Sequence, residues 1–191
     1  MKIEEIYSEL ASHMVKGLMV HSQMADYYYF LGLHGYGCCH EYHFLAESRA
    51  YRRLCRYFTK HHDKLIPETQ IVNPEVIPNT WFTHVRSDVD SNTKKNAVKT
   101  GLTKWYDWET ETKQLYHRMY KELMDIGEVA DALHLCEYIN DVDKELESVT
   151  KYKLMKESTG YDISGIISEQ KTKKEKYKCK MRGLFDEHTG H

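Results

Sequence analysis

The chain has 191 residues, a formal net charge of -2 at pH 7 and a hydrophobic content of 41%. This length is sufficient for one domain with a substantial apolar core. The small net charge excludes a global electrostatic attraction to nucleic acid or membranes, and no segment approaches the roughly 18 apolar residues of a membrane span.

The cysteines and the first residues indicate the cellular compartment. The cysteines are odd in number and show neither a CxxC pair nor zinc-finger spacing; they are Cys38, Cys39, Cys55, Cys136 and Cys179. The N-terminal MKIEEIYSEL lacks the basic start and apolar run of a signal peptide. Free thiols without a targeting signal are typical of a reducing compartment, so we expect a cytoplasmic protein.

Apolar residues recur at helical spacing along most of the chain. This periodicity predicts four long helices, at about residues 3–31, 38–62, 93–126 and 129–156. Three glycines are expected to end the first helix and one to end the third; they are Gly32, Gly35, Gly37 and Gly127. The three prolines all fall between residues 67 and 78, which predicts one long connection with a short turn near Trp81.

Two short connections and one long connection predict a four-helix bundle over residues 1–160. The first two helices should be antiparallel, as should the last two, whereas the long crossover makes the second and third parallel. No strand-like alternation competes with this interpretation. Residues 161–191 form a C-terminal extension that could contain one short amphipathic helix.

The first two predicted helices resemble those of the ferritins. The likeness lies in QMADYYYFLGLHGYG followed by FLAESRAYRRLCRYFT, against the Q-M-x-x-W/Y and E-x-x-H patterns of ferritin helices A and B. The distance from Met24 to Glu47 equals the bacterial ferritin spacing, and DALHLCEYINDVDKELE resembles the ferritin D helix. The resemblance covers roughly residues 8–155 and implies an all-α, ferritin-like four-helix bundle with a long crossover between helices B and C.

The resemblance also implies oxidation of Fe(II) at a dinuclear site held by carboxylates and a histidine. Those ligands carry over unevenly. The helix B glutamate falls on Glu47, but the histidine three residues later falls on Ala50 and the helix A glutamate falls on Met14. The helix A tyrosine falls on His21, and the helix D glutamine falls near Glu145. The resemblance therefore implies the fold more strongly than the ferroxidase activity.

The helix C ligand position of the ferritins falls at or within one residue of Lys113. An inward ammonium there would replace the metal and pair with Glu47 and Glu145. In the competing arrangement, Lys113 turns outward to pair with Glu109, while Glu47 binds a metal with His21 and Glu145. One residue of helix register rotates a side chain by about 100°, so the sequence leaves both arrangements open.

Four residues are the candidate metal ligands: Glu47, His21, Glu145 and Glu109. Glu47 interrupts the apolar stripe of the second helix, where an unpaired charge costs several kcal/mol and requires a partner. For Glu109 the alternative is an exposed i, i+4 pair with Lys113, worth about 0.3–0.5 kcal/mol. For His21 the alternative is a hydrogen-bonded core histidine.

Two further rows of ligand-type residues have a structural alternative. His40, His43 and Glu47 follow i, i+3, i+7 spacing and form a relocated zinc or iron site or else cover a helix end near solvent. Glu137, Asp141 and Glu145 have i, i+4 spacing, which is more typical of a solvated face than of a metal ladder.

Partners are suggested by two local features. The consecutive Tyr27, Tyr28 and Tyr29 span all faces of one helix, which predicts a homo-oligomer because one bundle could not bury all three. Between Lys171 and Arg182 there are seven basic residues and one acidic residue. This composition favours a solvated or disordered tail over a nucleic-acid site, so we expect no nucleic-acid binding.

Hydrolase and nucleotide-binding signatures such as GxSxG, the Walker loop and HExxH are absent from the sequence. The function predicted is therefore that of a ferritin-like metal-binding protein with a strongly altered dinuclear site. Iron is the default metal, and zinc is the other divalent candidate. The alternative is a metal-free helical bundle that acts as a structural or interaction protein. No membrane association is expected under either hypothesis.

Overall fold

A computed structural model describes residues 2–66 and 89–186 of the chain. Within those ranges the chain forms helices and no strand. The helices are α1 (Ile3–Phe30), α2 (His34–His62), α3 (Ser91–Asp125), α4 (Val129–Ser158), α5 (Ile163–Ser168) and α6 (Gln170–Asp186). The four long helices that the apolar periodicity predicts are thus confirmed, whereas the prolines and the turn expected near Trp81 lie outside the described residues.

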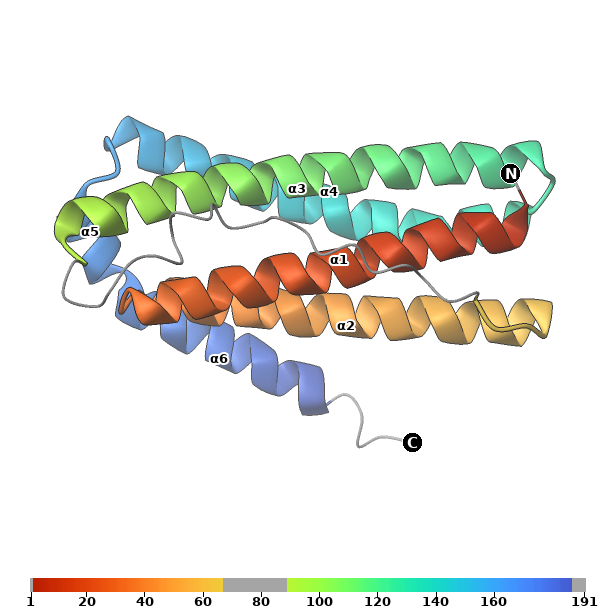
Figure 1. Ribbon diagram of the computed structural model, residues 1–191, viewed down its shortest axis with the longest axis horizontal. Coiled ribbons are helices and arrows are strands. Elements are labelled where there is room, and N and C mark those ends of the chain that lie inside the picture. Colours follow the sequence, from red (N-terminus) through yellow and green to blue (C-terminus); the bar gives the residue numbers. More distant parts are fainter. Residues whose placement is uncertain (1, 67–88, 187–191) are drawn as a thin grey trace.

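The long helices form an all-α bundle (Figure 1). α1 and α2 lie antiparallel, as do α3 and α4, and α2 and α3 run in the same direction at opposite ends of the long connection. None of the described helices is both long enough and apolar enough to cross a membrane. The predicted bundle with a crossover between its second and third helices is therefore confirmed.

Two of the glycines expected to end helices do so in the left-handed region of backbone space. Gly32 has φ +73 after α1, and Gly127 has φ +84 after α3, where a side chain would be strained. Gly35 and Gly37, in contrast, lie inside α2, so the expectation that they end the first helix was wrong. A Cβ at Gly35 would approach the backbone oxygen of Gln170 to 2.6 Å, which explains the need for glycine there.

The core consists of two apolar clusters separated by a polar layer. One cluster contains Val20 of α1 and Trp105 of α3, and the other contains Met14 of α1 and Leu115 of α3. Glu109, which is buried, lies between the two clusters along α3. This central layer holds the polar side chains described in the next subsection.

The three consecutive tyrosines fit into a single bundle. Tyr27 and Tyr28 are buried, and the hydroxyl of Tyr29 donates a hydrogen bond of 2.5 Å to Glu41. Tyr28 also reaches α3, where its hydroxyl donates to the backbone oxygen of Ala97 at 3.3 Å. The reason given above for an oligomer, that one bundle cannot accommodate these rings, was therefore wrong.

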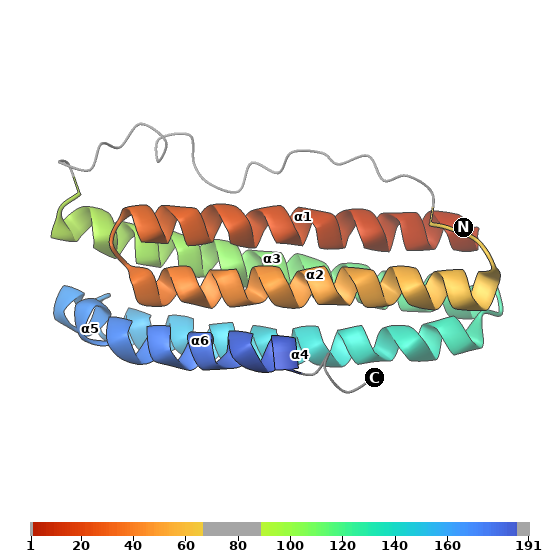
Figure 2. The ribbon, with the colours of Figure 1, turned by 90° about the horizontal axis from the view of Figure 1, so that it is seen from below.

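The C-terminal extension is helical and packs on the bundle, with α6 lying along α2 (Figure 2). Tyr177 of α6 is buried in the first apolar cluster. The amide of Gly35 donates to the side chain of Gln170 at 2.8 Å, and the ammonium of Lys173 lies 3.7 Å from the ring centre of Tyr152. The basic stretch between Lys171 and Arg182 is therefore helical and not disordered, although most of its basic side chains are exposed, as expected of a solvated face. The domain division at residue 160 stays a prediction.

Candidate metal centre

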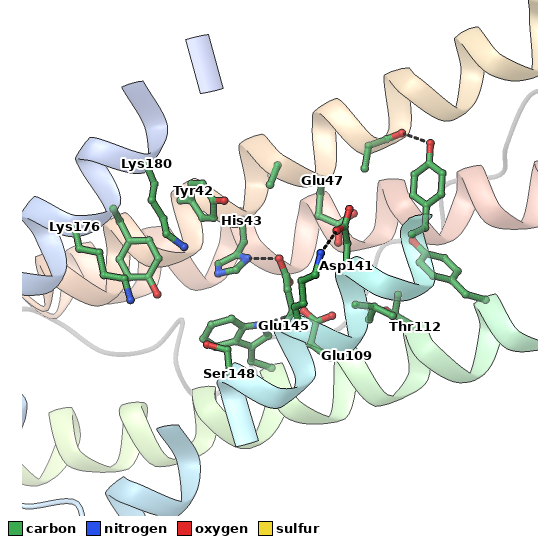
Figure 3. A pocket seen from close by; sticks show the side chains of 18 residues that line it. Tyr42, His43, Glu47, Glu109, Thr112, Asp141, Glu145, Ser148, Lys176 and Lys180 are labelled. Atoms are coloured by element: carbon green, nitrogen blue, oxygen red, sulfur yellow. Dashed lines mark hydrogen bonds and ion pairs between the residues drawn. The ribbon is translucent and has the colours of Figure 1, made fainter. Parts of the chain in front are cut away.

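A cavity of about 420 Å³ opens in the polar layer between α2, α3 and α4. Four carboxylates line it: Glu47 from α2, Glu109 from α3, and Asp141 and Glu145 from α4. Asp141 is exposed, so the inner three come from three different helices. Figure 3 shows these side chains together with His43, Lys176 and Lys180. The cavity therefore combines an acidic interior with lysines contributed by α6.

The backbone next to Glu47 leaves room for this carboxylate. A Cβ built on Gly17 of α1 would lie 3.4 Å from the carboxyl carbon of Glu47 and 3.0 Å from the Trp108 ring. The approach to Trp108 is tighter than ordinary packing, whereas the distance to Glu47 is an ordinary van der Waals contact, so the glycine chiefly lets α1 lie close to the Trp108 ring beside Glu47. The absence of a side chain at residue 17 is thus part of how the site is built.

Glu109 and Glu145 are each held by a polar contact with another side chain. The indole Nε1 of Trp105 donates a hydrogen bond of 2.9 Å to Glu109, one helical turn away on α3. Nδ1 of His43 lies 3.2 Å from Oε1 of Glu145, which joins α2 to α4. Glu145 and Glu109 also share a side-chain hydrogen bond. The side chain of Glu145 is 31% exposed to solvent, so it lies between the buried centre and the surface.

A histidine cluster lies beside the carboxylates. Nδ1 of His21 and Nδ1 of His40 are 3.0 Å apart, so one nitrogen donates to the other. Nε2 of His21 lies 4.0 Å from Oε1 of Glu109 and has no hydrogen-bond partner among the described atoms, although the residue is fully buried. Burial lowers the pKa of His21 to about 3, so its imidazole is neutral and Nε2 can act as an acceptor or as a metal ligand.

The environment favours the protonated form of two of the carboxylates. Burial, followed by the negative charge of Glu145, raises the pKa of Glu47 to about 8. Burial and the charges of Glu145 and Glu47 raise the pKa of Glu109 well above its usual range. Like-charged groups in a shared, poorly solvated space disfavour one another's ionised forms. Mutual repulsion of the carboxylates is therefore one cause of these shifts, and a bound cation would offset it.

The third carboxylate is ionised through its contact with His43. Burial opposes the ionisation of Glu145, but the charge of His43 and the hydrogen bond to it outweigh that effect and lower the pKa of Glu145 to about 2. Burial likewise opposes the charged form of His43, yet Glu145 and Cys39 raise its pKa well above the usual value. The Cys39 thiol hydrogen-bonds to His43, which lowers the pKa of the thiol despite its burial.

Lys113 does not enter the centre. Its ammonium forms an ion pair of 2.6 Å with Asp143, and its side chain is 38% exposed. The proposed pairing with Glu47 and Glu145 was therefore wrong, and so was the proposed surface pairing of Lys113 with Glu109. Glu109 is buried and bonded to Trp105 instead, so it is not the exposed carboxylate of the alternative interpretation.

The structure brings together the four predicted ligand candidates. Glu47, Glu109 and Glu145 line one cavity, and His21 lies against Glu109. His40 and His43 are buried, so their interpretation as a cover for a helix end near solvent was wrong. The acidic run on α4 divides: the side chains of Glu137 and Asp141 are exposed and lie near Arg53, whereas Glu145 reaches the centre.

Three partners of these side chains were missed from the sequence. Trp105 was assigned only to the apolar stripe, although tryptophan four residues before a buried glutamate can donate to it along the helix. Cys39 and Tyr177, which hydrogen-bond to each other across α2 and α6, had no such signal. Their contact depends on how the C-terminal helix packs.

Carboxylate and imidazole donors suit Fe(II) and other divalent first-row metals. The unpartnered Nε2 of His21 and the excess of carboxylates are consistent with a cation at this centre. Nevertheless, in the described part of the chain no three His, Cys, Asp or Glu side chains are grouped closely enough to hold a metal ion. The residue types therefore fit a metal, while its binding would require side-chain rotation within the cavity.

The sequence matches no protein-family model, and no curated protein sequence is significantly similar to it. Solved structures are similar in fold. An engineered closed form of the Archaeoglobus fulgidus ferritin has a TM-score of 0.75 at 12% identity, with 91% of this chain and 96% of that chain covered. A humanized archaeal ferritin has a TM-score of 0.74 at 13% identity, with 90% and 94% covered. The open pore ferritin from A. fulgidus has a TM-score of 0.73 at 13% identity, with 89% and 93% covered.

The fold resemblance stated from the sequence is thus confirmed over most of the chain. Structural similarity at 12% and 13% sequence identity supports the arrangement of the helices, but it gives no information on the chemistry of the site. The protein is a helical bundle with the ferritin-like fold.

Proposed function

We propose that this protein binds a divalent metal, with iron as the default cation, at the centre formed by Glu47, Glu109, Glu145 and His21. The observation that carries the proposal is the convergence of three carboxylates from three helices on one cavity. A cation would offset their mutual repulsion, and Nε2 of His21 offers a neutral nitrogen donor. The ligand set differs from that implied by the ferritin resemblance, so the dinuclear site is strongly altered.

The similar proteins are ferritins by name, which supports iron as the first metal to test. Under this proposal the chain's own residues hold the cation, while the apolar clusters on either side limit its contact with bulk water. Ferroxidase-type activity is a further consequence to be measured, because an oxidisable metal next to an accessible cavity could react with oxygen. We further infer a cytoplasmic location from the free thiols expected from the sequence.

The metal proposal is tested by purifying the protein without chelator and measuring iron, zinc and manganese by elemental analysis. Anaerobic titration with Fe(II) should then give a defined stoichiometry. In the double variant Glu47→Gln/Glu109→Gln, we expect Fe(II) affinity at least about tenfold lower because two oxygen ligands become neutral amides. Glu175→Gln, an exposed carboxylate on α6, is the matched control and should bind as the unmutated protein does.

A second candidate function is a metal-free structural or interaction bundle. It is favoured because two of the carboxylates already have partners within the protein. Glu109 accepts a hydrogen bond from Trp105, and Glu145 forms an ion pair with His43. The same titration separates the two proposals. If the unmutated protein takes up none of the three metals, the metal proposal fails and the interaction bundle stands.

We propose that the protein forms a homo-oligomer. The proposal rests on apolar side chains that are exposed around the connection between α3 and α4. The consecutive tyrosines do not support it, because a single bundle accommodates them. They are Met124, Ile126, Val129 and Leu133, the last being 61% exposed. Clusters of this kind often mark interfaces between protein subunits.

We expect light scattering to give a mass above the 22.7 kDa of one chain. The variant Val129→Ser/Leu133→Ser should shift the mass toward that of the monomer because it removes apolar area from the proposed interface. A matched pair of changes at exposed polar residues, Thr103→Ser and Asn96→Ser, should leave the mass unchanged. A monodisperse monomer of the unmutated protein at high concentration would contradict the proposal.

A further inference from the structure

A second cavity, of about 630 Å³, adjoins the carboxylate cavity and is lined by residues of α2, α4 and α6. Ala46, Ala50 and Asp141 line both cavities. Five cationic residues of α2 line the second one: Arg49, Arg52, Arg53, Arg56 and Lys60. We call this cavity and these five residues the basic groove.

The spacing of the cations places them along one side of α2. They follow i, i+3, i+4, i+7 and i+11, which are neighbouring positions on a helix surface. At ~1.5 Å per residue the row extends over roughly 16 Å. The chain as a whole is slightly acidic, with a net charge of -2, so this row is a local concentration of positive charge.

Acidic residues of α4 pair with one of the groove's cations, Arg53. The two terminal nitrogens of Arg53 lie 3.7 Å from Glu137 and 3.8 Å from Asp141, and its Nε donates to the Tyr138 hydroxyl at 3.2 Å. Arg52, Arg56 and Lys60, in contrast, are exposed and have no ion pair or hydrogen bond with any described residue. The groove therefore has several guanidinium and ammonium donors available to a ligand.

The remaining lining offers apolar and aromatic surface. Ala46, Ala50 and Leu184 supply apolar contacts, Leu184 reaching the groove from α6. The rings of Tyr57 and His134 are stacked, with centroids 3.7 Å apart and planes 9° from parallel. Burial is the main cause that lowers the pKa of His134, so its ring is neutral at pH 7 and adds no charge of its own. A ligand in the groove would thus contact cations together with planar and apolar surface.

We propose that the basic groove binds a small anion that carries several phosphate groups. Guanidinium groups recognise phosphate through paired N–H donors, and their row is long enough for more than one phosphate. The cavity volume falls within the usual range for small-molecule sites. A nucleic-acid strand is less suited, because the cationic row is short and the overall charge of the chain is slightly negative. The proposal does not depend on metal binding at the neighbouring carboxylates.

The test uses the full-length protein freed of metal on a chelating resin, so that its outcome is independent of the metal proposal. Tripolyphosphate, inorganic phosphate and a single-stranded oligonucleotide are titrated separately by calorimetry at 0.15 M salt. We expect saturable binding of tripolyphosphate that is tighter than that of inorganic phosphate, because more of the cations are engaged. In Arg52→Gln/Arg56→Gln, the tripolyphosphate dissociation constant should rise at least about tenfold.

A matched variant removes the same charge elsewhere. Lys99→Gln/Lys104→Gln changes two exposed lysines of α3 and should keep the affinity of the unmutated protein. Circular dichroism checks that both variants remain helical. Equal loss of affinity in both double variants would show diffuse charge attraction and overturn the proposal. It is also overturned if tripolyphosphate fails to bind, or if the oligonucleotide binds through these arginines more tightly than tripolyphosphate does.

Discussion

Replacement of Glu47 by glutamine should stabilise the metal-free protein at pH 8 by about 2–4 kcal/mol and change its stability little near pH 4.5. The pKa of Glu47 is raised from 4.5 to about 8 in the folded protein, first by burial and then by the charge of Glu145. One pKa unit corresponds to about 1.4 kcal/mol. The side chain is only partly shielded from solvent, so the change in unfolding free energy is smaller than the full pKa difference would give.

The sign follows from the protons bound in each state. Between pH 4.5 and about 8 the folded protein retains a proton on Glu47 that the unfolded chain releases. The contribution of this group is therefore most favourable below pH 4.5, and it is lost as the pH rises through about 8. Glutamine cannot ionise, so the variant should escape this loss.

Urea unfolding of the metal-free protein and of Glu47→Gln between pH 4.5 and 8.5 measures the effect. The difference in unfolding free energy should grow with pH across that window. Glu175→Gln removes an exposed carboxylate and should show no such trend. A pH-independent difference, or a loss of stability at pH 8, would contradict the assignment of Glu47 as a carboxyl that folding keeps protonated. Divalent metal that occupies the centre should reverse the preference, because it binds the carboxylate and not the amide.

Replacement of Asp131 by alanine should destabilise the protein by about 2–5 kcal/mol. Asp131 is buried near the start of α4, where its Oδ1 accepts a hydrogen bond of 2.5 Å from the Tyr7 hydroxyl. The same oxygen lies 2.9 Å from Nε2 of His62. One carboxylate thus connects α1, α2 and α4, and alanine would leave the buried donors without an acceptor.

Thermal and urea unfolding at pH 7 measure this loss. Tyr7→Phe removes one of the two donors, so the double variant Tyr7→Phe/Asp131→Ala should lose less than the sum of the two single changes. Asp107→Ala on the exposed face of α3 is the matched control and should change stability by less than about 0.5 kcal/mol. Additive losses in the double variant would show that the Tyr7–Asp131 bond does not contribute as proposed.

The sequence by itself determined the helical architecture. Apolar residues at helical spacing specify four long helices because each must bury one face against another. Gly32 and Gly127 mark two helix ends because their left-handed backbone conformations favour glycine. Glu47 could be selected as a site residue for a similar local reason, since a carboxylate within an apolar stripe requires a partner wherever the helix packs.

Only the tertiary structure decided which partners the polar side chains meet. Lys113 pairs outward with Asp143, and Glu109 turns inward to Trp105, because a rotation of about 100° per residue separates the two outcomes. The sequence determined helix positions to within a few residues, which is too coarse to fix that rotation. Contacts between helices far apart in the chain had no local signal at all, as for His43 with Glu145 and for the packing of α6 on α2. Their geometry depends on the packing of whole helices and not on the residues next to them.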